Sequence, residues 1–139
     1  MAAISITAAS VLASATAVVR REYKFGATVT AGQVVYLNSS SLWVLADSDA
    51  ASTGNGINDL MGIALNGGSS GQPAAVCTED TDFTPGGTLT NGLAVYLFTT
   101  AGAISQADIP TTAAYPVILG VAKSTSKMVL KRAASGAVI

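Results

Sequence analysis

Short apolar runs separated by segments rich in Gly, Ser and Asn recur along the chain, a pattern typical of β-strands joined by turns. Near the start, Ile4 and Ile6 alternate with Ser5 and Thr7, and this period of two predicts a half-buried strand. Residues 11–22 are interpreted as extended, because their Ser, Thr and Val content favours strand over helix. Further strands are expected near residues 33–37, 41–45, 61–65, 73–78, 94–98, 103–106, 117–122 and 127–132.

One stretch of the pattern occurs twice. GATVTAGQVVYL at residues 26–37 returns as GGTLTNGLAVYL at residues 86–97, with seven of the twelve positions identical. A looser similarity follows each copy, between residues 60–65 and 118–123 and between residues 73–77 and 127–131. The repeated residues are those of turns and strands, and neither copy could bury its apolar face alone. We therefore expect an all-β fold, a small barrel or sandwich built from two pseudo-repeated β-motifs.

The domain organisation follows from this repeat. We expect an extended N-terminal arm at residues 1–20 and a single β-domain at residues 21–139, with repeat 1 at about 26–80 and repeat 2 at about 86–132. The first nineteen residues carry no charge, and no basic segment precedes their apolar run, which disfavours a signal peptide. Ser and Thr interrupt the run too often for a membrane span. Such an arm could add a strand to a neighbour's sheet edge.

Composition argues against enzymes. The chain has no histidine, the usual general base and the commonest metal ligand, and a single cysteine, Cys77, which is interpreted as a small buried hydrophobe. Glu79, Asp80 and Asp82 do not match a calcium-binding loop and are interpreted as solvated turns. The sequence predicts no catalytic, cofactor-binding or metal-ligating residue.

Charge is sparse and segregated. Charged residues are 11% of the chain, against about 25% in typical soluble domains. This indicates either a surface partly covered by other subunits or one made soluble by Ser, Thr and Asn. All seven basic residues fall in two groups, which are Arg20, Arg21 and Lys24 near the start and Lys123, Lys127, Lys131 and Arg132 near the end.

If the two basic groups meet in space, they form a patch that could dock on an acidic protein surface. A nucleic-acid partner is disfavoured, because the net charge is −1 and no aromatic residues lie between the basic ones. Trp43 and Tyr115 lie outside the repeated core and are interpreted as contact residues. The candidate interface comprises Ile4, Ile6, Val11, Leu12, Arg20, Arg21, Lys24, Trp43, Tyr115, Lys123, Lys127 and Lys131.

Six phrases in fixed order cover nearly the whole chain, namely ISITAASV, GATVTAGQVVYL, MGIALNGGSSGQPAAV, GGTLTNGLAVYL, AGAIS and YPVILGVAKSTSKMVLK. In these phrases the chain resembles the small decoration (cement) proteins of tailed-phage heads, a family of repeat-containing β-proteins. It departs from the family pattern at Ala103, where a second Gly is frequent, and in the polar loop at Asp47–Asp59.

The resemblance implies a structural protein without a catalytic site, cofactor, nucleic-acid partner or membrane partner. It implies a homo-oligomer, dimer or trimer, bound in many copies to the major capsid protein on the outer surface of the virion and made in the host cytoplasm. Two other classes remain open. One is a tail, baseplate or head-fibre anchoring component, and the other is a cell-surface or carbohydrate-binding β-module.

Overall fold

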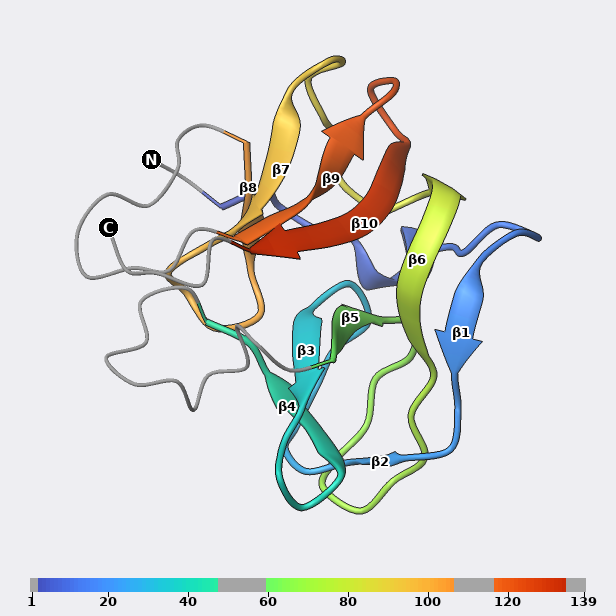
Figure 1. Cartoon of the computed structure of the whole chain (residues 1–139), viewed down its shortest axis with the longest axis vertical. Coiled ribbons are helices and arrows are strands. Elements are labelled where there is room, and N and C mark those ends of the chain that lie inside the picture. The colour runs from blue at the N-terminus through green and yellow to red at the C-terminus, as the bar shows by residue number, and fades with distance from the viewer. Residues whose placement is uncertain (1–2, 48–59, 107–116, 135–139) are drawn as a thin grey trace.

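A computed structural model describes residues 3–47, 60–106 and 117–134, and these form an all-β fold (Figure 1). The only helical element in this part of the chain is a 3-10 turn at Ala8–Ser10. The strands are β1 (Val18–Arg20), β2 (Lys24–Phe25), β3 (Val34–Leu37), β4 (Leu42–Leu45), β5 (Met61–Ala64), β6 (Val76–Phe83), β7 (Ala94–Leu97), β8 (Ile104–Ser105), β9 (Val117–Ala122) and β10 (Met128–Ala134).

The predicted strands from residue 33 onward are confirmed, with ends shifted by a few residues. The predicted loop at Asp47–Asp59 lies, apart from Asp47, outside the described residues.

The strands form one sheet in the order β2-β4-β3-β5-β6-β10-β9-β7-β8, and β1 pairs with β6. Every pairing is antiparallel except that of β2 with β4. In the described part of the chain the sheet is not closed, because β2 and β8 end the order without pairing to each other. Of the two architectures that the sequence left open, a sandwich-like sheet fits.

The two sequence copies lie side by side in the sheet in opposite orders. The first copy runs as β4-β3-β5-β6 and the second as β10-β9-β7-β8. In the sequence repeat β4 corresponds to β8, β3 to β7, β5 to β9 and β6 to β10. Backbone hydrogen bonds correspond as well: Gly32 N–H donates to Ala64 O at 2.8 Å, and Gly92 N–H donates to Ala122 O at 2.9 Å. Both glycines have a positive φ, 94° and 85°, which the turn before each strand requires.

The two copies pack by stacking one on the other. One face of the first copy is buried with Phe25 in a smaller core, to which the copy contributes Val35, Trp43, Ala64, Ala74 and Val76. Its opposite face contributes Val34, Tyr36, Met61, Ile63 and Cys77 to the larger core. There it meets the inner face of the second copy, which contributes Val95, Leu97, Ile104, Met128 and Leu130. The second copy therefore covers the outward face of the first (Figure 1).

The described part of the N-terminal segment, residues 3–20, lies against the rest of the chain. Ile4 N–H donates to Ile104 O and Thr7 N–H to Gly86 O, each at 2.8 Å. Because these bonds reach two different segments, no continuous ladder forms, and the predicted strand at residues 4–7 is absent.

The side chains of the segment take part in the same packing. Ile4, Ile6 and Val11 are partly buried against the larger core. Ile6 lies over Gly32 of the first copy and Gly87 of the second. The segment thus bridges the two copies and belongs to the folded domain.

This packing predicts that the N-terminal segment is needed for stability. Ile6→Ala is expected to lower the free energy of unfolding by about 1–3 kcal/mol, because it removes partly buried methyl groups from the core. Urea unfolding can be followed by the fluorescence of Trp43, the only tryptophan and fully buried. The matched control is Leu12→Ala in the same segment, where 65% of the residue is exposed, with an expected change within about 0.5 kcal/mol. Equal effects of the two variants would contradict this account of the segment.

Candidate interaction surface

The outward face of the second copy is exposed and apolar. Ile118, Val121 and Val129 are each exposed by more than a third. Val121 pairs in register with Val129 of β10 on one side and with Ala94 of β7 on the other. Neighbouring residues of paired strands project to the same side of a sheet, so these side chains form one surface. We call Ala94, Tyr96, Ile118, Val121 and Val129 the apolar face.

Basic residues border the apolar face at the turn between β9 and β10. Lys123 Nζ and Lys127 Nζ lie 3.4 Å and 3.0 Å from the two carboxylate oxygens of Asp82 on β6. The hydrogen bond from Lys127 is the main cause that holds the pKa of Asp82 below its usual value. Two cations share one carboxylate, so this end of the face keeps a net positive charge.

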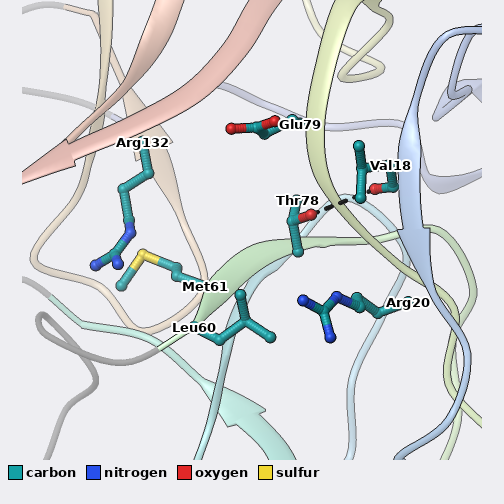
Figure 2. Close-up of a pocket in the computed structure, with 7 residues that line it drawn as sticks. All are labelled: Val18, Arg20, Leu60, Met61, Thr78, Glu79 and Arg132. Atoms are coloured by element: carbon teal, nitrogen blue, oxygen red, sulfur yellow. Dashed lines mark hydrogen bonds between the residues drawn. The ribbon is translucent and has the colours of Figure 1, made fainter.

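A pocket of about 350 Å³ lies at the seam between the two copies (Figure 2). Along one edge of β6, Val76 and Cys77 pair with β5, whereas residues 79–83 pair with β10. The two partner strands diverge at this point and leave a gap. We call it the seam pocket, and it is lined by Val18, Arg20, Leu60, Met61, Thr78, Glu79 and Arg132.

One residue from each of the two predicted basic groups, Arg20 and Arg132, lines the seam pocket. Figure 2 shows Arg20 and Arg132 on opposite sides, with Leu60 and Met61 between them. Thr78 Oγ1 donates to the carbonyl oxygen of Val18 at 3.4 Å and so links β6 to β1 across the pocket. Arg20 Nη1 also lies 3.1 Å from Glu22 Oε1.

The remaining predicted basic residues lie at other places. Lys131 is exposed on β10, in register with Glu79. Arg21 lines a different depression with Asn66 and Pro73. Lys24 is in β2, beside Leu42 of β4.

Trp43 does not belong to the interaction surface, which corrects its prediction as a contact residue. It is fully buried in the smaller core, with the ring of Tyr23 edge-on at 6.5 Å. The place of Trp43 in the repeat explains its burial. Trp43 pairs with Leu37 in the first copy, and at the corresponding place in the second copy the core residue Ile104 pairs with Leu97. Tyr115 lies outside the described residues. Ile4, Ile6 and Val11 pack inward, and of the predicted apolar interface residues of the N-terminal segment only Leu12 is largely exposed.

Sequence reasoning missed the structural role of Asp80, which is only 3% exposed and lies in β6 rather than in a solvated turn. Its Oδ2 accepts the backbone N–H of Ser14 at 2.7 Å, and its Oδ1 accepts the Ser14 hydroxyl and the Asp82 N–H. Burial raises the pKa of Asp80, but these donors outweigh burial and hold the pKa below its ordinary value. The carboxylate therefore clamps the segment that leads into β1 onto β6.

Cys77 is fully buried, which confirms its interpretation as a small hydrophobe. Burial, with a smaller contribution from the nearby charge of Asp80, raises the pKa of its thiol to about 12. The thiolate is the reactive form, so this cysteine is inert at neutral pH.

Neither a protein-family model nor a curated protein matches the chain. Over the described ranges, no cluster of three or more His, Cys, Asp or Glu is placed to hold a metal ion. In the same ranges, the helical turn at Ala8–Ser10 is far too short to span a bilayer.

The Asp80 clamp predicts an acid-sensitive stability. Because its folded pKa lies below the unfolded value of about 3.9, its contribution is present above that pH and is lost as the pH falls through the folded pKa. Asp80→Asn is expected to cost about 1–3 kcal/mol at pH 7 and to flatten the decline of stability below pH 4. Urea unfolding across this pH range measures both effects.

The control for this experiment is Asp82→Asn, because Asp82 is a more exposed carboxylate two residues away whose ion pairs contribute little. If Asp80→Asn and Asp82→Asn were equally stable at pH 7, the clamp would not have the assigned role.

Proposed function

We propose that this protein is a capsid decoration (cement) protein of a tailed phage. It binds the major capsid protein on the outer surface of the head, bridges neighbouring capsomers and acts as a homo-oligomer. It is made in the host cytoplasm and ends on the virion surface. The order and coverage of the six sequence phrases carry the proposal, and the apolar face and the seam pocket support it.

The chemistry of these two places suits protein docking. The apolar face is bordered by Lys123 and Lys127 beside Asp82, and the seam pocket is lined by Arg20 and Arg132. The seam pocket is lined by two arginines and one glutamate, Glu79, so its lining carries a net formal charge of +1 (two minus one), which fits an acidic segment of a capsid subunit. Each contact can be weak, since an oligomer that binds several subunits at once gains avidity through effective concentration.

A tail, baseplate or head-fibre anchoring component could use the same surface, and copy number separates it from a cement protein. A carbohydrate-binding module is less well supported, because sugars stack on exposed aromatic rings and Trp43 is fully buried.

Binding to capsids from which the protein has been removed tests the proposal. Hundreds of saturable copies per shell are expected, with shells that resist higher temperatures. A handful of copies would indicate a vertex or tail component, and no binding would favour the carbohydrate-binding module. Both of these outcomes contradict a cement role.

The cations of the seam pocket are expected to carry part of this binding. The double variant Arg20→Gln, Arg132→Gln should weaken shell binding about tenfold at low salt, and the difference should shrink as salt rises. Arg21→Gln is the matched control, because Arg21 lies away from the seam pocket. Equal binding by the two variants would remove the seam pocket from the docking surface.

A further inference from the structure

The seam pocket holds two cations at separate places. Arg20 reaches it from β1 and Arg132 from β10, two strands that pair with opposite edges of β6. Figure 2 shows the two side chains on opposite sides of the pocket, with Leu60 and Met61 between them. Two cations separated by an apolar stretch match a ligand that carries two separate anions.

The place of the pocket in the sheet sets the geometry of such a ligand. β5 and β10 pair with the same edge of β6, at Cys77 and at Glu79, and the pocket lies where they diverge. In an extended peptide, side chains at alternate positions project to one side, about 7 Å apart. An extended segment can therefore direct two acidic side chains into this one pocket when they stand at alternate positions.

We propose that the seam pocket binds an extended peptide segment that carries carboxylates at two alternate positions. One carboxylate pairs with Arg20 and the other with Arg132, and the methylene groups of the two acidic side chains lie over Leu60 and Met61. Guanidinium groups make strong, charge-assisted hydrogen bonds to carboxylates. The inference rests on the proposed function for the identity of the partner, a capsid subunit, but its test needs no capsid.

The lining favours carboxylates over the phosphates of a nucleic acid. None of the seven described residues that line the pocket is aromatic, so nucleotide bases have no ring on which to stack. Glu79 leaves the lining with a formal charge of only +1, which attracts a nucleic-acid backbone weakly. Val18, Leu60 and Met61 instead offer apolar contacts to the aliphatic part of acidic side chains.

Arg20 already has a carboxylate partner within the chain, which the ligand replaces. Arg20 Nη1 lies 3.1 Å from Glu22 Oε1, and the two side chains are 43% and 49% exposed. The hydrogen bond from Arg20 is the main cause that holds the pKa of Glu22 below its ordinary value, so Glu22 is charged at neutral pH. Exposed ion pairs of this kind contribute little to stability. Glu22 therefore competes with the ligand for Arg20, and its removal is expected to strengthen binding.

Fluorescence anisotropy of a labelled, blocked peptide with the full chain at low salt tests the proposal. The probe has two glutamates on either side of one valine. Its isomer, with the two glutamates adjacent and thus directed to opposite sides, is expected to bind at least about threefold more weakly. A peptide with glutamine at both positions is expected to bind at least about tenfold more weakly. Equal binding by the probe and either of these peptides would overturn the proposal.

Variants of the protein test the same contacts in both directions. Glu22→Gln is expected to bind the probe about two- to threefold more tightly, because Arg20 loses its competitor. The double variant Arg20→Gln, Arg132→Gln is expected to bind about tenfold more weakly, and the control Arg21→Gln as the wild type does. A gain of affinity cannot come from a failure to fold. Unchanged or weaker binding by Glu22→Gln would contradict the pairing of the ligand with Arg20.

The peptide and shell experiments separate this inference from the proposed function. If the probe binds as expected but the protein does not bind shells, the pocket keeps its ligand and the cement role fails. If hundreds of copies bind each shell but the probe does not bind, the inference fails and the cement role stands. Stronger binding of a single-stranded oligonucleotide than of the probe would also overturn the inference.

Discussion

The packing of the second copy onto the outward face of the first is the contact on which the rest of the structure depends. It forms the larger core, and it makes the first copy a layer buried on both sides, with Val35 and Val76 on one side and Val34 and Ile63 on the other. It also places β10 beside β6, where the divergence from β5 opens the seam pocket. Removal of apolar area from water on both sides of one layer is the dominant favourable term in such a fold.

The duplication visible in the sequence predicted the strands of both copies because turn glycines and alternating apolar residues are local signals. It could not predict which faces of the copies meet, since alternation shows that a strand has two faces but not what covers each. Trp43 illustrates the limit: seen alone it suggested an exposed contact, whereas its counterpart Ile104 indicates a core position. The contacts of the N-terminal segment could not be predicted, because its partners lie far along the chain, at Thr84, Gly86 and Ile104.

The interaction surface was predictable only in part. Lys123 and Lys127 were expected on one side of a strand, and they do lie together, yet Asp82 between them offsets much of their charge. The meeting of Arg20 with Arg132 depends on the pairing of β1 and β10 with opposite edges of β6, which no local pattern encodes. The apolar face was missed because Ile118, Val121 and Val129 have the composition of core residues, and only the end of the stack leaves them exposed.

The Asp80 clamp on Ser14 affects how the chain acquires its fold. Ile4, Leu12 and Ser14 leave the ribosome well before their partners Ile104, Thr84 and Asp80. Contacts that close such long loops must wait until most of the chain has been made, and long-range β pairing is slow. The N-terminal segment is therefore synthesised before its partners but ordered late, once both copies are present.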